Sequence, residues 1–168
     1  LERRIVLSQY IMAVNEAGSL PPQESGLVNN GWYGKYHHEM IWWHCTHYAL
    51  WDRWPLMNKM MEVYPHNLET YKKSAKAQGY KGVRWPKTIG DRTWWEWPNE
   101  TNPLLIWQQP HFIYLAELVY RNNPSDEIIR KYNRLVQETA DFMYSFATYD
   151  ELEGRFVLKG AIPAQETL

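Results

Sequence analysis

Hydrophobic positions recur with a helical period in five stretches of the chain, and strand-like alternation is confined to 155–159. The predicted helices cover about 2–14, 37–51, 55–78, 102–121 and 124–148. Gly18 is a stop signal for the first helix, and Pro65 is expected to break or kink the third. Asn102 is expected to cap the fourth helix, with Pro103 as its first residue.

The predicted helices are of two kinds. The fifth has one apolar stripe opposite a charged face, which is typical of a helix lying between a core and water. That stripe consists of Ile128, Ile129, Tyr132, Leu135, Val136, Thr139, Phe142, Met143 and Phe146. The second and fourth helices are apolar in nearly every direction, over 40–51 and over 104–107 with 112–116. Such helices are expected to be surrounded by other helices.

The order along the chain therefore alternates between outer and inner helices. Connections alternate too, and the long ones cover 18–36, 79–101 and 150–168. Ile41-Trp42 recurs as Ile106-Trp107, each early in an inner helix, as expected for a repeat. This pattern predicts an all-α, α/α-hairpin toroid of one domain over 1–168, incomplete at about two and a half of six hairpins, with its long loops on one rim.

The composition adds an aromatic bias to this picture. The chain has 10 Trp and 12 Tyr but only 4 Phe. Trp and Tyr combine a flat apolar face with a polar edge, which suits the C–H face and the hydroxyls of a pyranose ring. Large aromatic side chains also fill ordinary helical cores, so composition alone leaves a carbohydrate site and a plain core both open.

Charge and cysteine content exclude several classes of partner. A net charge of −1 gives no basic groove for nucleic acid, and the apolar runs are too short to span a membrane. The single cysteine, Cys45, excludes an internal disulfide framework. The chain begins at Leu1 without a signal peptide, which we interpret as a cut or processed end. The compartment stays open, with an extracytoplasmic parent protein favoured.

Two carboxylates are candidates for acid chemistry. Glycosidic cleavage needs a protonated carboxyl beside the leaving oxygen and a base or anion on the other side of the sugar. Glu166 follows an apolar segment that would raise the pKa of such an acid, and Glu39 opens an inner helix among Trp and His. The alternatives are a solvated loop residue for Glu166 and a buried carboxylate paired with a nearby histidine for Glu39.

The remaining candidate residues lie in the long loops or directly after them. The expected sugar contacts are His37, Glu39, Trp42, Trp32, Trp85, Trp95, Gln108 and Gln109. A zinc site is not expected, although His38-Glu39 opens like a metalloprotease helix, because that motif requires a second histidine where Trp42 stands. Core hydrogen bonds are the predicted role of His44 and His47. No cofactor is predicted.

Over 21–166 the sequence resembles the six-hairpin glycosidase superfamily, and in particular glycoside hydrolase families 65 and 95 and related proteins of Bacteroides type. Segment 79–86 is similar to the Gly-Tyr-x-Gly-Ala-x-aromatic-Pro loop of family 65, and 37–43 to the Asn-x-x-Glu-Met-x-Tyr-Trp region of family 95. Segment 156–166 resembles the family 65 segment ending in Gly-Pro-Asp-Glu. His37 replaces the family 95 Asn, and Ala164-Gln165 replaces Pro-Asp.

The resemblance implies that Glu166 is the general acid and that His37 and Glu39 contact the sugar being cleaved. It also implies that the base, or the phosphate site replacing it, lies on hairpins after Glu166, so this chain alone is expected to be inactive. An inverting glycoside hydrolase is the first prediction. A phosphorylase, a carbohydrate-binding module on the same toroid and a polysaccharide lyase are the alternatives. The uncovered inner helices are expected to pair with another copy or with the rest of the parent enzyme.

Overall fold

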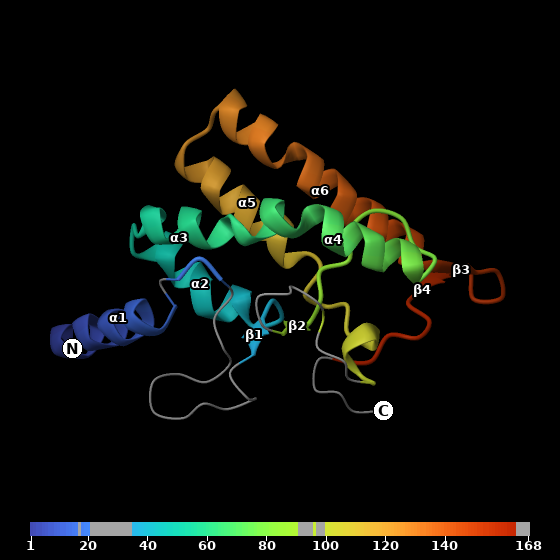
Figure 1. Ribbon diagram of the computed structural model, residues 1–168, viewed down its shortest axis with the longest axis horizontal. Coiled ribbons are helices and arrows are strands. Elements are labelled where there is room, and N and C mark those ends of the chain that lie inside the picture. The colour runs from blue at the N-terminus through green and yellow to red at the C-terminus, as the bar shows by residue number, and fades with distance from the viewer. Residues whose placement is uncertain (17, 21–34, 91–95, 97–99, 164–168) are drawn as a thin grey trace.

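A computed structural model describes residues 1–16, 18–20, 35–90, 96 and 100–163. These residues are mostly helical, with two small antiparallel sheets (Figure 1). The helices are α1 (Glu2–Glu16), α2 (Ile41–Leu50), α3 (Trp54–Met61), α4 (Val63–Ala77), α5 (His111–Asn122) and α6 (Asp126–Phe146), with a 3-10 turn, η2, at Asn102–Leu104. The strands are β1 (Tyr36–His37), β2 (Thr88–Ile89), β3 (Thr148–Asp150) and β4 (Arg155–Val157). None of the helices within these ranges is long and apolar enough to cross a bilayer.

The predicted amphipathic stripe of α6 is confirmed for five of its nine positions, whereas Ile129 and Met143, also predicted to belong to it, are exposed. Tyr132, Leu135, Thr139, Phe142 and Phe146 are all buried, and they follow the three-and-four spacing of one helix face. Ser125 caps the helix, since its hydroxyl oxygen accepts a hydrogen bond from the backbone N–H of Ile128 at 3.3 Å. α6 packs against α5, to which a short turn joins it, and against α4.

The third predicted helix is two helices, and the break lies one turn before the proline. α3 ends at Met61 and α4 begins at Val63, with Glu62 between them. Pro65 has no N–H to donate to the carbonyl of Met61, and its ring crowds that carbonyl. It is accepted in the first turn of α4, where such N–H groups lack helical partners in any case.

The predicted start of the fourth helix is wrong. Asn102 and Pro103 begin only the short η2, and α5 starts at His111. Pro110 directly precedes α5 and donates no backbone hydrogen bond, so a helix does not run through it. The second helix also starts later than predicted, because Tyr36 and His37 pair as a strand instead.

The expectation that the inner helices are surrounded on all sides is not met by α2. Its buried residues, Ile41, Cys45 and Tyr48, lie on one face. Trp43 and Leu50 are 58% and 79% exposed. α2 packs on α1, α3 and α5, and the main core is formed by residues of α2, α3, α4, α5 and α6 together with Trp85. The structure thus supports a mostly helical domain, and the closed order of a toroid stays a prediction.

Candidate functional site

The first two long loops meet at a two-stranded sheet. Tyr36 of β1 pairs with Ile89 of β2, and His37 pairs with Thr88. In the turn after β1, the backbone N–H of Glu39 donates to the carbonyl of Lys87 at 3.2 Å. This pairing holds the residues just before α2 against residues 87–89 of the second loop.

Glu39 lies buried at this junction, only 6% exposed. Its Oε1 accepts a hydrogen bond from the indole N–H of Trp107 at 3.0 Å, and its Oε2 lies 3.5 Å from Nζ of Lys87. A lysine, rather than the histidine expected as one alternative, therefore provides the charge partner. The two contacts hold the carboxylate in one orientation, because each oxygen has its own donor.

Three buried histidines near this junction, His37, His38 and His111, are neutral near pH 7. Burial lowers the pKa of His37 to about 4, although its ring contact with the carbonyl of Lys35 acts in the opposite direction. Burial also lowers the pKa of His38 to about 3 and that of His111 to about 4. The ring of His111 packs edge-on against Trp107 at 5.0 Å. A neutral imidazole carries one donor and one acceptor nitrogen, the pair of functions that suits a hydroxyl group.

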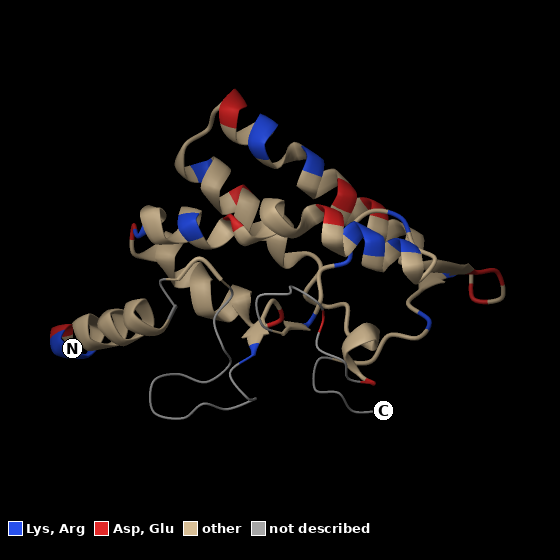
Figure 2. Cartoon of the chain, viewed as in Figure 1, with Lys and Arg blue, Asp and Glu red and all other residues tan. Residues whose placement is uncertain are grey.

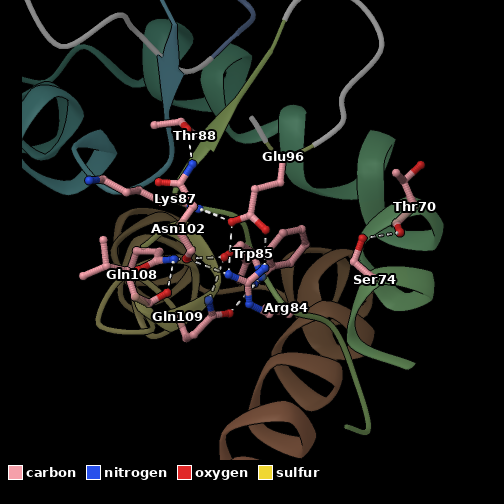
Figure 3. Close-up of polar contacts among 11 residues, drawn as sticks. Thr70, Ser74, Arg84, Trp85, Lys87, Thr88, Glu96, Asn102, Gln108 and Gln109 are labelled. Atoms are coloured by element: carbon pink, nitrogen blue, oxygen red, sulfur yellow. Dashed lines mark hydrogen bonds and ion pairs between the residues drawn. The ribbon is translucent and has the colours of Figure 1, made fainter. Parts of the chain in front are cut away.

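Gln108 and Gln109 hold the second loop from below (Figure 3). Oε1 of Gln109 accepts from the backbone N–H of Trp85 at 2.8 Å, and its Nε2 donates to the carbonyl of Trp85 at 2.7 Å. Nε2 of Gln108 donates to the carbonyls of Trp85 and Leu105. Both glutamines are 1% exposed, so in this structure their amides position the loop.

Arg84 forms a buried ion pair that sequence reasoning missed. Its guanidinium binds both carboxylate oxygens of Glu96, at 2.7 and 3.0 Å, and donates to the carbonyl of Asn102. Oε1 of Glu96 also accepts from the backbone N–H of Lys87, and Asn102 Nδ2 donates to the hydroxyl of Thr88. The sequence shows that Arg84 and Glu96 lie in the same aromatic-rich loop, but their spacing does not indicate that they pair.

Trp85, predicted as a sugar contact, lies in the core. It is 1% exposed, and its indole N–H donates to the hydroxyl of Thr139 on α6 at 2.9 Å. Tyr64 and Phe112 pack against its ring at 4.9 and 5.9 Å. Its side chain therefore ties the second loop to α4, α5 and α6 in this structure.

Trp42 belongs to a different environment, a partly open aromatic cluster on α2 and α5. Its ring lies edge-on to Trp43 at 4.7 Å and tilted against Tyr114 at 5.7 Å. Trp43 is 58% exposed and Tyr114 38%. Trp42 lies in the first turn of α2, three residues after Glu39 along the chain.

The third long loop returns to the same region. The backbone N–H of Ile162 donates to the carbonyl of Leu104 at 3.1 Å, and Ala161 packs against a small core of Ala75, Phe142 and Phe146. The described ends of all three long loops are thus linked through β1, β2 and η2. Glu166, Trp32 and Trp95 lie outside the described residues.

In the described part of the site, Glu39, the imidazoles of His37 and His38 and the amides of Gln108 and Gln109 are buried, whereas Trp43 and Tyr114 provide exposed aromatic surface. Within the ranges that the structure covers, no three histidine, cysteine or acidic residues are grouped to hold a metal ion. Exposed aromatic faces of this kind can pack against apolar C–H groups of a ligand. No known protein-family model matches the chain, and no curated protein matches it in sequence.

Proposed function

We propose that this chain is part of the catalytic domain of an inverting glycoside hydrolase of the six-hairpin type. The observation that carries the proposal is the junction of the three long loops, where Ile162 is hydrogen-bonded to Leu104 and Glu39 is bonded to Trp107. Glu166 follows Ile162 by four residues along the chain, so a short segment leads from that junction to the candidate acid.

In the proposed reaction, Glu166 donates its proton to the glycosidic oxygen as the bond to the anomeric carbon breaks. A base on hairpins after Glu166 takes a proton from the attacking water on the opposite face of the sugar. His37 and Glu39 contact hydroxyls of the sugar being cleaved. Lys87 and Trp107 act as positioning residues, because they hold the two oxygens of Glu39.

The test is hydrolysis by the protein with the sequence that follows Leu168 included. Glu166→Gln is expected to reduce turnover by about a thousandfold or more while binding is kept, because the amide has no proton to donate at that position. Glu151→Gln, the same change at an exposed glutamate, is the control and is expected to keep full activity. Full activity of Glu166→Gln would exclude this residue as the acid.

The products discriminate among the related reactions. Inverting hydrolysis gives a sugar of opposite anomeric configuration, which NMR detects immediately after cleavage. A sugar 1-phosphate formed in phosphate buffer indicates a phosphorylase instead. An unsaturated, ultraviolet-absorbing chain end indicates a lyase.

A carbohydrate-binding module without catalysis is the second candidate, and the open cluster of Trp42, Trp43 and Tyr114 favours it. Such a module binds oligosaccharides with quenching or shifting of tryptophan fluorescence, and Glu166→Gln changes nothing in it. Trp43→Ala is then expected to weaken binding by about tenfold, since an exposed aromatic face is lost. Trp51→Ala, at an indole 44% exposed at the other end of α2, is the matched control.

A further inference from the structure

One face of α1 carries an apolar stripe that the described residues leave open. Leu7, Tyr10, Ile11 and Val14 are 51%, 63%, 41% and 50% exposed. Their spacing of three, one and three residues places them on one side of the helix. The same spacing recurs where an amphipathic helix docks on a partner.

The opposite face of α1 already has a partner in the chain. It borders a hollow shared with α2 that is lined by Arg4, Ile5, Ser8, Gln9, Met12, His47 and Trp51. The guanidinium of Arg53 also donates to the side-chain oxygen of Gln9 at 3.1 Å. The contact of α1 with α2 thus uses a mixed polar and apolar face, and the apolar stripe on the other side takes no part in it.

Charge does not protect the open face from association. No charged residue occurs between Ile5 and Asn15, and α2 beside it has none either. Figure 2 shows the contrast with α4 and α6, along which charged residues of both signs are frequent. A solvated helix ordinarily carries polar residues on its outer face, so an uncharged apolar stripe indicates a contact surface.

We propose that the open face of α1 binds the same face of a second copy of this chain, with the two helices antiparallel. The stripe is symmetric about a point between Tyr10 and Ile11. A two-fold axis there sets Leu7 opposite the partner's Val14 and Tyr10 opposite the partner's Ile11, so one stripe complements itself.

The charge at the start of α1 selects the antiparallel arrangement. Arg3 precedes Leu7 by four residues and lies on the same stripe, where it borders a shallow depression with Glu2, Val6, Leu7 and Tyr10. A positive charge in the first turn is unfavourable beside its own helix N-terminus. Antiparallel pairing sets Arg3 near the last carbonyls of the partner helix, where α1 has no basic residue. Parallel pairing would instead bring the two arginines together.

Sedimentation velocity over a range of concentrations tests the proposal on the 168-residue chain. A reversible monomer–dimer equilibrium is expected, and Ile11→Glu is expected to weaken it by about tenfold or more, because a charge is buried at the two-fold axis. Leu152→Glu, at a 98% exposed leucine between β3 and β4, is the matched control and leaves the equilibrium unchanged. Near-ultraviolet circular dichroism confirms that each variant is folded.

Cysteine cross-linking tests the orientation. Ile11→Cys lies next to the axis and is expected to form a covalent dimer under a mild oxidant. Val14→Cys is not, because the two copies of residue 14 lie roughly 10 Å apart along the helices, beyond disulfide reach. A mixture of Leu7→Cys and Val14→Cys chains is expected to cross-link with each other.

A chain that stays monomeric at every concentration would overturn the proposal, and so would a dimer that Ile11→Glu leaves intact. Efficient cross-linking of Val14→Cys with itself would show a parallel pair and would overturn the orientation. The apolar groove between α5 and α6, lined in part by Ile113, Tyr120 and Ile129, is the other candidate contact. A dimer lost on Ile129→Glu but kept on Ile11→Glu would assign the contact to that groove instead.

Discussion

The segment 84–87 and the surface formed by α1 and α2 use their side chains in opposite ways. Around Arg84, Trp85 and Lys87, polar groups are buried and joined to specific partners on η2, α6 and the residues just before α5. On α1 and α2, large apolar side chains such as Tyr10 and Trp43 face outward. An irregular loop is therefore fixed by complementary hydrogen bonds, whereas two regular helices are only partly covered. In this chain, a segment without regular secondary structure can therefore be fully packed, while a regular helix can remain partly exposed.

The largest effect is expected from the buried histidines, which should make the protein less stable in acid. Between pH 6.5 and about 4, the histidines of the unfolded chain take up protons while His37, His38 and His111 stay neutral in the folded chain. The unfolded state then binds more protons, so stability falls as the pH falls. Lowering the pH from 7 to 4.5 is expected to reduce the free energy of unfolding by on the order of 5 kcal/mol. Urea unfolding at each pH measures it.

His38→Phe separates this effect from general acid denaturation. The fully buried ring is replaced by an apolar one among aromatic neighbours, so one of the three proton-linked contributions disappears and the pH dependence flattens. His66→Phe, at an exposed position, is the control and keeps the wild-type slope. An unchanged slope in His38→Phe would contradict the assignment.

The second effect concerns the close approach of the same loop to α6. Gly82 has a φ of 67°, and a Cβ added there would lie 2.0 Å from the carbonyl oxygen of Glu138. Gly82→Ala is expected to cost about 3 kcal/mol, since it combines a left-handed backbone with overlap against the main chain. Gly79→Ala is the matched control, because its φ is 85° but no atom lies within 4 Å, and about 1 kcal/mol is expected.

The third effect concerns the ion pair between Arg84 and Glu96. Arg84→Met keeps the apolar stem but leaves Glu96 and the carbonyl of Asn102 without this donor. A loss of about 2 kcal/mol is expected, less than for a fully enclosed pair because the Glu96 side chain is 18% exposed. Arg134→Met, which removes an exposed pair with Glu69, is the comparison and should change stability by about 0.5 kcal/mol or less. Thermal or urea unfolding decides between them.

The smallest change in stability is expected at the exposed surface of α2. Trp43→Gln replaces an indole that is 58% exposed and is expected to change the free energy of unfolding by about 0.5 kcal/mol or less. A loss above about 2 kcal/mol, measured in the same urea experiment, would show that this indole is covered in solution and would remove the contrast between the two regions.

Local patterns predicted the parts of the fold that depend on local physics. The buried positions of the α6 stripe and the strand at Arg155–Val157 follow from side-chain period and are confirmed. The prediction of a break near Pro65 was right in kind, because the proline acts on the preceding carbonyl. The start of α5 was missed although Pro110 marks it in the sequence. The bonds from Gln108 and Gln109 to the backbone of Trp85 were not predictable from a local pattern, because they join residues far apart along the chain.

The candidate site shows the same division. Glu39 was identified by its place at the entry to a helix, but its partner Lys87 became visible only when β1 and β2 paired. Trp85 and Trp42 were both predicted to contact a sugar because they are tryptophans near the long loops. Trp85 instead fills the core, whereas Trp42 lies beside exposed aromatic side chains. Period and composition report that an indole is present, and only the surrounding elements decide which of its faces is left for a ligand.

The two bonds between Gln109 and Trp85 reproduce, with a side chain, the paired bonds that one antiparallel strand makes to another. A side-chain amide here stands in for a peptide group. Position 109 consequently tolerates little chemical change: glutamate lacks the donor, lysine lacks the acceptor and asparagine is one methylene too short. A strand in this place would expose unpaired backbone N–H and C=O groups on its other edge, whereas a side-chain amide makes these two bonds and exposes no such edge.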